Sequence, residues 1–452
     1  MRRTSLSFQS ALLPDGWAEN VRVDIADGRI ARVTAGSAAE PGDESHAIGL
    51  PGMPNLHSHA FQRAMAGLTE RRGAGEDSFW TWRDLMYRFV ERLDPETMAA
   101  VAAMAFVEML EAGFTRVGEF HYVHHAPDGS PYADRAAMAG ALVEAARETG
   151  IALTLLPVFY AQGGFGAAPP GEAQRRFINT VDSYAALLQA SRAAVGALPD
   201  AVVGVAPHSL RAVAPDQLSA IVPLAGGGPV HIHIAEQERE VADCLAWSGA
   251  RPVEWLLANA PVDRQWCTVH ATHMTDAETS ALARSGAVAG LCPITEANLG
   301  DGLFPARAFL DAGGAFGVGS DSNVRIDCAE ELRLLEYGQR LVTRRRNVLA
   351  GSSGATGADL FRAALAGGGQ ALGRASGIAV GNCADIFSLA TDHPSVVHRT
   401  GDELLDAFVF AGGGGMIDRV WRGGVVCVED GRHVARDAMA ARYRGALGRL
   451  LA

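Results

Sequence analysis

Short apolar runs alternate with longer helix-like stretches along most of this chain of 452 residues. Runs of this length that alternate with helical segments predict βαβ units and a parallel sheet. Eight such runs can be counted, and they cover Leu50–His59, Phe114–His121, Ile151–Phe159, Val202–His208, Pro229–Ile234, Trp266–His270, Ala287–Pro293 and Ala315–Asp321. Eight parallel strands, each followed by a helix, predict an α/β fold of the (β/α)8 TIM-barrel type.

The two ends of the chain show a different pattern, in which short strand-like runs are separated by turns. Near the N-terminus these runs are Leu6–Gln9, Val21–Ile25 and Arg29–Val33, and Asp27-Gly28 between the last two is a strong hairpin signal. The later runs are Ala384–Ala390, Leu405–Phe410, Arg419–Arg422 and Val425–Glu429. Because neither end buries a core alone, we expect residues 1–49 and 380–452 to form one small β-sandwich domain. Residues 50–379 would form the barrel.

The charge composition excludes several classes of partner and mechanism. A formal net charge of −12 leaves no basic footprint for nucleic acid or for an anionic membrane surface. All 39 basic side chains are arginine, since the sequence contains no lysine. A Schiff-base lysine, a P-loop lysine and a carboxylated bridging lysine are therefore all excluded. A small molecule is the expected partner, and an anionic one would need local arginines to overcome the overall charge.

The cysteines and the apolar segments predict a cytoplasmic protein. The six cysteines are scattered without a CxxC pair, which favours reduced, buried thiols over disulfides or a zinc ribbon. The first residues lead into an alternating strand pattern, so we expect no signal peptide. No apolar stretch of about 18 residues without polar breaks occurs, so we expect no membrane span.

Two histidines one residue apart, His57 and His59, stand at the end of the first run. Side chains alternate along a strand, so both imidazoles point the same way and provide half of a divalent-metal site. The fifth run ends near His233, the sixth ends at His270, and the eighth ends at Asp321. A catalytic zinc ion favours nitrogen ligands with one position left for water, and His57, His59, His233 and Asp321 form a suitable set.

Three of these positions have alternative interpretations. His231 lies on the same run as His233 but farther from its C-terminal end, and we expect it to be a core histidine or a support for the ligands. Asp321 would ordinarily be a helix N-cap, but the three histidines favour metal binding. Glu236 follows His233 by three residues and can reach the same pocket, or it is a first-turn carboxylate that stabilises a helix dipole.

These residues fall into the motifs His57-x-His59, His233-x-x-Glu236, His270 and Gly319-Ser320-Asp321. Together the motifs resemble the amidohydrolase superfamily in its mononuclear deaminase branch, over essentially the whole chain. Binuclear members use a carboxylated lysine bridge, so the resemblance implies one divalent ion here, with Zn²⁺ as the expected ion. It also implies that Asp321 binds the metal and accepts a proton from water. Glu236 would carry a proton to the leaving nitrogen, and His270 would polarise the attacked bond.

Several longer segments narrow the resemblance. They are Asn55–Leu68, Phe79–Arg83, Glu119–His124, Ala206–Arg211 and Gly319–Asn323. These segments are similar to the formimidoylglutamate deiminase family. The resemblance implies a deiminase that hydrolyses N-formimino-L-glutamate to N-formyl-L-glutamate and ammonia, a step of histidine degradation. It also leads us to expect a homodimer.

A substrate with two carboxylates needs paired cations, and the planar fork of arginine suits carboxylates. Arg211 follows the fourth run and Arg83 follows the first, so both are candidate clamps. The alternative for each is a surface salt bridge. Gln62, Tyr122 and His208 are candidate hydrogen-bond partners of the substrate.

Other interpretations stay open at this point. Trp80 and Trp82 form either a lid over the site or a packing contact. The segment Cys292–Asn298 follows the seventh run, and we assign it no catalytic role. Alternative functions are a deaminase of a purine, pterin or adenosine derivative, an amidase, and a scaffold that has lost its chemistry. A purine pocket would favour aromatic stacking and amide hydrogen bonds rather than two arginine clamps. Substitution of Arg83 or Arg211 should therefore harm a deiminase of a dicarboxylate far more than a purine deaminase.

Overall fold

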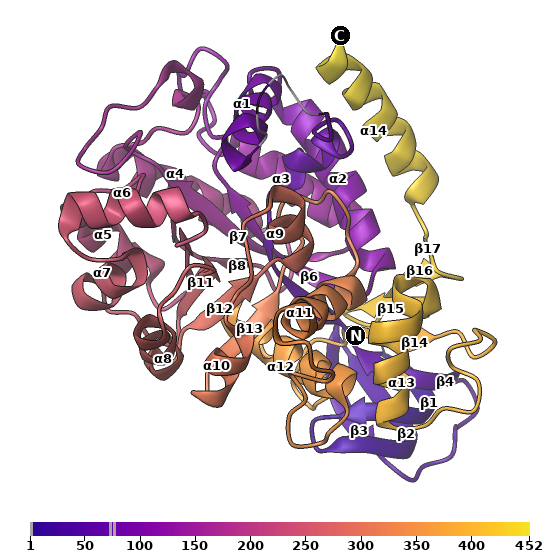
Figure 1. Ribbon diagram of the computed structural model, residues 1–452. Coiled ribbons are helices and arrows are strands. Elements are labelled where there is room, and N and C mark those ends of the chain that lie inside the picture. Colours follow the sequence, from indigo (N-terminus) through magenta and orange to yellow (C-terminus); the bar gives the residue numbers. More distant parts are fainter. Residues whose placement is uncertain (1–2, 72–74, 76–77) are drawn as a thin grey trace.

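A barrel of parallel strands lies beside a smaller sheet built from both ends of the chain (Figure 1). The computed structural model describes residues 3–71, 75 and 78–452. One half of the barrel contains β5 (Met53–Ser58), β6 (Phe114–His121), β7 (Ala152–Phe159) and β8 (Val202–Val203), with β9 (Ala206–Pro207) paired to β7. The other half contains β10 (Val230–Ile234), β11 (Trp266–His270), β12 (Val288–Leu291) and β13 (Ala315–Val318). These strands coincide with the eight predicted runs, and the predicted α/β barrel is confirmed.

Backbone hydrogen bonds join the two halves into one closed barrel. Between β13 and β5, the Asp321 amide donates to the His57 carbonyl at 2.9 Å, and the His59 amide donates to the Asp321 carbonyl at 2.9 Å. On the opposite side, the His233 amide donates to the His208 carbonyl at 3.1 Å. The four predicted metal ligands, His57, His59, His233 and Asp321, therefore lie on the two seams that close the barrel.

Helices follow the barrel strands and cover the outside of the barrel (Figure 1). They are α1 (Phe79–Val90), α2 (Pro95–Glu111), α3 (Ala137–Thr149), α4 (Val181–Val195), α5 (Pro215–Ile221), α6 (Glu238–Ser248), α7 (Pro252–Asn259), α8 (Asp276–Ser285), α9 (Pro293–Leu299), α10 (Ala306–Asp311), α11 (Cys328–Thr343) and α12 (Thr356–Ala371). Helix α2 has a strong N-terminal signal in its sequence, an aspartate cap followed by proline. The Asp94 carboxylate accepts a hydrogen bond from the Thr97 amide at 2.7 Å, and Pro95 occupies the first turn.

The smaller sheet places strands of the N-terminal part of the chain beside strands of its C-terminal part (Figure 1). Its strands are β1 (Arg3–Leu13), β2 (Gly16–Ala26), β3 (Arg29–Thr34), β4 (Glu44–Pro51), β14 (Ile386–Leu389), β15 (Ile417–Arg422), β16 (Val425–Glu429) and β17 (Arg432–His433). Strand β4 pairs in parallel with β1 and antiparallel with β14, so it joins the N-terminal strands to the C-terminal ones.

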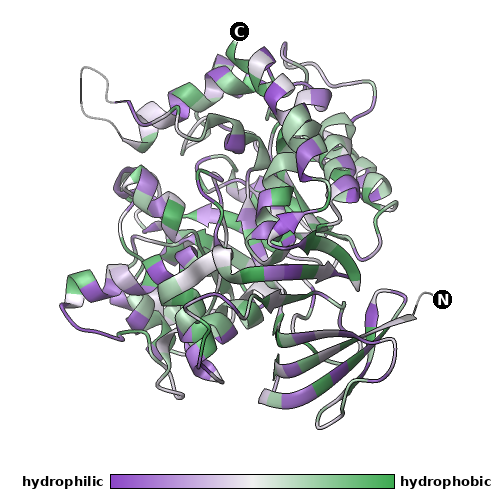
Figure 2. Ribbon diagram, turned by 90° about the vertical axis from the view of Figure 1, so that its right-hand side faces the viewer, coloured by the Kyte–Doolittle hydropathy of each residue, from purple (hydrophilic) through white to green (hydrophobic). Residues whose placement is uncertain are grey.

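Hydrophilic and hydrophobic residues alternate along the strands of this sheet (Figure 2). Some of its buried side chains, among them Phe8, Val23 and Trp421, form a separate core, whereas others, such as Leu50 and Phe387, belong to the main core that includes the barrel. The expected pairing of the two chain ends is thus present within one eight-stranded sheet. The two-layer sandwich arrangement and the domain borders at residues 49 and 380 stay predictions.

Two local expectations are wrong, and one helix was not expected. Leu405–Phe410 is helical, in α13 (Asp402–Ala407) and the π-helical turn Phe408–Gly412, because a short apolar run suits a buried helix as well as a strand. The first predicted run is interrupted at Gly52: its first two residues end β4, and β5 begins at Met53. The tail also contains an unexpected helix, α14 (Arg436–Leu451), which packs on α2.

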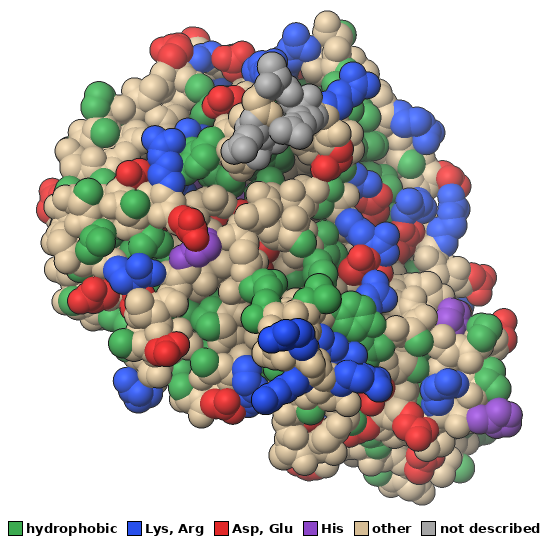
Figure 3. Space-filling view, viewed as in Figure 1, with side chains coloured by type: hydrophobic (Ala, Val, Ile, Leu, Met, Phe, Trp, Pro, Cys, Tyr) green, Lys and Arg blue, Asp and Glu red, His purple; other side chains and the backbone are tan. Residues whose placement is uncertain are grey.

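The described surface is polar and mixed in charge. Acidic and basic side chains are interspersed over the face shown in Figure 3. Within the described ranges, no helix is both long enough and apolar enough to cross a lipid bilayer. The six cysteines are all free, and five of them are buried.

Candidate active site

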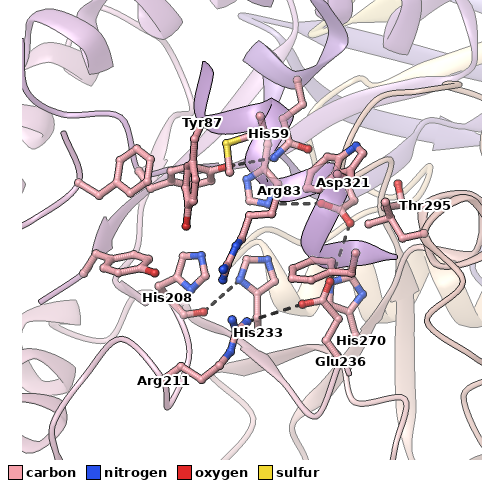
Figure 4. Close-up of a pocket in the computed structure, with 18 residues that line it drawn as sticks. His59, Arg83, Tyr87, His208, Arg211, His233, Glu236, His270, Thr295 and Asp321 are labelled. Atoms are coloured by element: carbon pink, nitrogen blue, oxygen red, sulfur yellow. Dashed lines mark hydrogen bonds and ion pairs between the residues drawn. The ribbon is translucent and has the colours of Figure 1, made fainter. Parts of the chain in front are cut away.

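Four buried side chains from three strand ends, those of His57, His59, His233 and Asp321, converge at the carboxyl-terminal end of the barrel, and Figure 4 shows the last three of them. The Nε2 atom of His57 lies 3.2 Å from His59 Nε2 and 3.0 Å from His233 Nε2. The Oδ1 atom of Asp321 lies 3.5 Å from His57 Nε2 and 3.3 Å from His59 Nε2. A tetrahedron with metal–ligand bonds of about 2.1 Å has edges of about 3.4 Å, so the three imidazoles, and Asp321 relative to His57 and His59, have spacings that suit a zinc-sized ion.

Hydrogen bonds hold two of the imidazoles with their Nε2 atoms directed at the shared centre. His59 Nδ1 donates to the Phe120 carbonyl at 2.8 Å, and His233 Nδ1 donates to the His208 carbonyl at 3.0 Å. Burial lowers the pKa of His57 to about 3 and also lowers the pKa values of His59 and His233. The three rings are therefore neutral, which is the form that binds a metal.

A polar network that the sequence analysis did not identify fixes Asp321. The backbone of Asp321 has a left-handed φ of 44°, and Asn323 Nδ2 donates to its carbonyl at 3.0 Å. Ser320 Oγ donates to Asn323 Oδ1 and accepts from Asn55 Nδ2, each at 2.6 Å. Strained backbone of this kind costs on the order of 1–3 kcal/mol per residue and is concentrated at functional sites. Only the fold brings Asn55 to this turn, so no local sequence signal could have revealed the network.

Glu236 and His270 lie beside Asp321. His270 Nε2 is 3.7 Å from Glu236 Oε1 and 3.8 Å from Asp321 Oδ2. Burial raises the pKa of Glu236 to about 7, although His270 and Arg211 oppose that shift. Burial lowers the pKa of His270, but the carboxylates around it raise it to about 10 overall. Glu236 can therefore exchange a proton near neutral pH, while His270 keeps both of its protons.

Glu296 supports His270, and the sequence analysis assigned it no role. Glu296 Oε1 lies 3.2 Å from His270 Nδ1 and also accepts the Cys292 amide at 3.0 Å. His270 Nδ1 donates to this carboxylate, which leaves Nε2 directed at the pocket. The Cys292 thiol lies within 4.8 Å of donor atoms of His270 and Asp321, but burial raises its pKa. A protonated thiol is a poor metal ligand.

His231 is directed away from the cluster. Its Nε2 atom donates to the Ala371 carbonyl at 2.8 Å. Burial lowers the pKa of His231 to about 4, so the ring stays neutral. The structure thus places His233, rather than His231, beside His57 and His59.

One pocket is lined by three members of the cluster, His59, His233 and Asp321, and by every residue expected to contact the substrate. It is lined by His59, Gln62, Phe79, Trp82, Arg83, Met86, Tyr87, Tyr122, Tyr160, Phe177, His208, Arg211, His233, Glu236, His270, Thr295, Leu299 and Asp321. Gln62 Nε2 donates to the Tyr122 hydroxyl at 2.9 Å. Burial lowers the pKa of His208, so its ring is neutral and available for hydrogen bonding. The pocket wall therefore combines aromatic rings with neutral polar groups.

The two arginines of the pocket are only weakly paired (Figure 4). Arg211 Nη2 lies 3.9 Å from Glu236 Oε2, and its Nε atom lies 3.8 Å from Glu240 Oε2 without a hydrogen-bond partner in the described structure. The Nε atom of Arg83 is buried and also lacks such a partner among the described residues. Two guanidinium groups therefore face the pocket with unused donors.

Comparison with known proteins identifies the class. Residues 48–427 match the model of the amidohydrolase family, and residues 8–47 match that of the formimidoylglutamate deiminase HutF N-terminal domain. The chain belongs to the amidohydrolase family. A solved amidohydrolase from Brucella melitensis is 53% identical and superposes with a TM-score of 0.97 over 99% of this chain and 100% of that one.

Individual proteins similar to this chain include a deiminase and two deaminases, which differ in their degree of similarity to it. A formimidoylglutamate deiminase from Pseudomonas aeruginosa is 52% identical over 99% of this chain and 100% of its own length. A 5-methylthioadenosine/S-adenosylhomocysteine deaminase from Natronomonas pharaonis is 27% identical over 92% of this chain and 91% of its own length. A zinc-bound adenosine deaminase from Xanthomonas campestris, 23% identical with a TM-score of 0.80 over 99% of this chain and 98% of its own, shares the fold.

Proposed function

We propose that this protein is a metal-dependent deiminase that hydrolyses N-formimino-L-glutamate to N-formyl-L-glutamate and ammonia, as in histidine degradation. The enzyme is a hydrolase that acts on C–N bonds, here in a linear amidine. The relative from Pseudomonas aeruginosa, at 52% identity over essentially the full chain, supports this reaction. The observation in the structure that carries the substrate assignment is the pair Arg83 and Arg211 beside the histidine cluster.

The metal site would consist of His57, His59, His233 and Asp321. Three neutral imidazoles and one carboxylate favour a single Zn²⁺ ion among the divalent metals. When bound, the ion lowers the pKa of a water molecule towards neutrality and polarises the C=N group.

Three side chains would move or hold protons during the reaction. Asp321 Oδ2, which faces His270 at 3.8 Å, accepts the proton of the attacking water. His270 Nε2 donates a hydrogen bond to the tetrahedral intermediate, and Glu296 fixes the orientation of the ring. Glu236 Oε1 delivers a proton to the leaving nitrogen, a role supported by its pKa of about 7.

The glutamate part of the substrate would bind through its two carboxylates. Arg83 and Arg211 supply the cations, and bidentate pairs with carboxylates would use their free Nε donors. Gln62, Tyr122 and His208 add hydrogen bonds along the same wall of the pocket. A substrate with one carboxylate would leave one of the two guanidinium groups unpaired, at a cost of about 1–3 kcal/mol.

The reaction can be tested by measuring ammonia release from N-formimino-L-glutamate by the zinc-loaded protein, with guanine and adenosine as comparators. We expect release from the formimino compound alone. Arg211→Ala should lower kcat/KM by about 10- to 100-fold, the equivalent of one charged hydrogen bond. Arg88→Ala, on an exposed α1 position that lines no described pocket, is the matched control. Release from a purine alone would replace the proposed substrate and favour the alternative deaminase.

A cytoplasmic location and a homodimeric state complete the proposal. Six free cysteines support a reducing compartment. Fractionation of the source cells tests the location, and analytical ultracentrifugation of the full chain tests the dimer.

A further inference from the structure

A second cavity lies immediately outside the active-site pocket. It is lined by Trp80, Arg83, Gly163, Gly164, Phe165, Arg211, Arg239, Asp243, Ala246 and Trp247. Among the described residues, Arg83 and Arg211 alone line both cavities. The two cavities therefore meet at a pair of guanidinium groups.

Three guanidinium groups lie close to the indole ring of Trp80 in the outer cavity. The Cζ atoms of Arg83 and Arg239 lie 4.6 Å and 4.7 Å from the ring centroid, and Arg211 Cζ lies at 5.8 Å. Cation–π contacts at these distances are favourable and hold the cations near one another. Trp82, two residues further along α1, lines only the inner pocket. Trp80 thus lines the outer cavity, and Trp82 lines the inner pocket.

The arginines of this outer cavity are only loosely paired. Asp243 is the one acidic residue among the described residues that line the cavity; it lies 3.7 Å from Arg239 in an i,i+4 pair on α6, and both side chains are more than half exposed. An exposed pair of this kind contributes little and leaves Arg239 free to change partners. The nearest carboxylates to Arg211 are 3.8 Å and 3.9 Å away. Within the described structure, Arg239 is paired loosely with Asp243, Arg211 lies at the limit of pairing with Glu236 and Glu240, and Arg83 forms no ion pair.

We infer that the outer cavity is a carboxylate-binding subsite through which the dianionic substrate reaches the active site, with Arg239 as its outermost contact. This inference rests on the proposed function, because it takes its ligand from that reaction. Arg239 is 66% exposed, so it can meet the substrate in solvent. Arg83 and Arg211 then receive the carboxylates at the boundary between the cavities.

The rest of the outer cavity suits a carboxylate on a short aliphatic chain. Phe165 and Trp247 stack with their ring centroids 5.4 Å apart and an interplanar angle of 28°, which provides an apolar wall. Methylene groups can lie against this wall while the carboxylate faces Arg239. A local cluster of cations raises the concentration of anions near a site and speeds their association, and salt screens this effect.

The test measures KM and kcat for N-formimino-L-glutamate at low and high ionic strength in the zinc-loaded full chain. In Arg239→Gln we expect KM to rise by about three- to tenfold at low salt, and the increase to shrink at high salt. The effect should fall on KM rather than kcat, because the interaction is distant from the reacting bond. Arg239→Glu should raise KM further, and Arg239→Lys should restore most of the wild-type value.

The matched control is Arg345→Gln, which makes the same change in net charge at an exposed position outside both cavities. Equal KM values and equal salt dependence in Arg239→Gln and Arg345→Gln would overturn the inference while leaving the proposed function intact. Absence of turnover by the wild-type protein is a different result. It would refute the proposed function, and the inference would fail with it.

Discussion

The two ends of the barrel use arginine in opposite ways. At the amino-terminal end, Asp200 forms a close ion pair with Arg116 of β6 and lies 2.9 Å from Arg374 Nε. At the carboxyl-terminal end, Arg83 forms no ion pair within the described chain, and Arg211 has carboxylates only at 3.8 Å and 3.9 Å. Arg116 and Arg374 at one end are therefore hydrogen-bonded to a carboxylate of the protein, whereas Arg83 and Arg211 at the other end have no carboxylate within hydrogen-bond distance in the described structure.

The contrast reflects two different functions. Arg422 of β15 and Arg29 of β3 also approach Asp200, at 3.7 Å and 3.6 Å, so this carboxylate links the barrel to the small sheet. The Cys383 thiol donates a further hydrogen bond to it at 2.9 Å. Charges that are paired internally stabilise the fold, and charges left unpaired at the carboxyl ends of barrel strands are available to a ligand.

Removal of the metal should have the largest effect, and it should act on the carboxyl-terminal end. Dialysis against a chelator should abolish ammonia release and lower Tm, because a ligand that binds only the folded state stabilises it. Zn²⁺ should restore both properties. Activity and Tm that both survive complete metal loss, measured by elemental analysis, would refute the assigned ligand set.

Glu236→Gln should separate chemistry from stability. Loss of a proton carrier should lower kcat by about 10²- to 10⁴-fold. Tm should change little, because the substitution removes a buried carboxyl whose pKa is already raised by burial. Ammonia release and thermal melts measure the two effects, and Glu238→Gln on the exposed first turn of α6 is the control. A kcat close to the wild-type value would remove Glu236 from the mechanism.

Asp200→Asn should lower stability and leave kcat unchanged, the reverse of the effect of Glu236→Gln. Several arginines would lose their shared carboxylate, which should lower the free energy of unfolding by about 3 kcal/mol. The kcat of the folded protein should stay at the wild-type value, since Asp200 lies at the opposite end of the barrel. Denaturant unfolding and activity at a temperature below the transition test the two parts. A fall in kcat without loss of stability would contradict the division between the two ends.

The smallest expected effect is on the pH dependence of stability. Burial raises the pKa of Asp200, but Arg116 and the other partners lower it overall. A depressed pKa in the folded state means that the carboxylate stabilises the protein above its unfolded pKa of about 3.9, and that this contribution is lost as the pH falls through the folded-state value. The Tm difference between wild type and Asp200→Asn should therefore shrink below about pH 4. A difference that stays constant from pH 7 to pH 3 would exclude this linkage.

Local sequence was enough to predict the strands and several turns. Asp27 and Gly28 have φ values of 50° and 82°, as the hairpin between β2 and β3 requires. The eight barrel strands follow from apolar runs, and the spacing of His57 and His59 follows from strand alternation. Leu405–Phe410 was mispredicted because a short apolar run does not distinguish a strand from a buried helix.

The sequence by itself determined the barrel, the candidate ligands and the candidate clamps, because each depends on residue type and short-range spacing. Tertiary structure decided which side chains meet. Asn55 and Ser320 are 265 residues apart, and Glu296 reaches His270 across 26 residues. The outer cavity likewise joins Trp80 of α1 to Arg239 of α6. Contacts of this kind depend on the closure of the barrel and the packing of its helices, and a pattern read along the chain does not contain them.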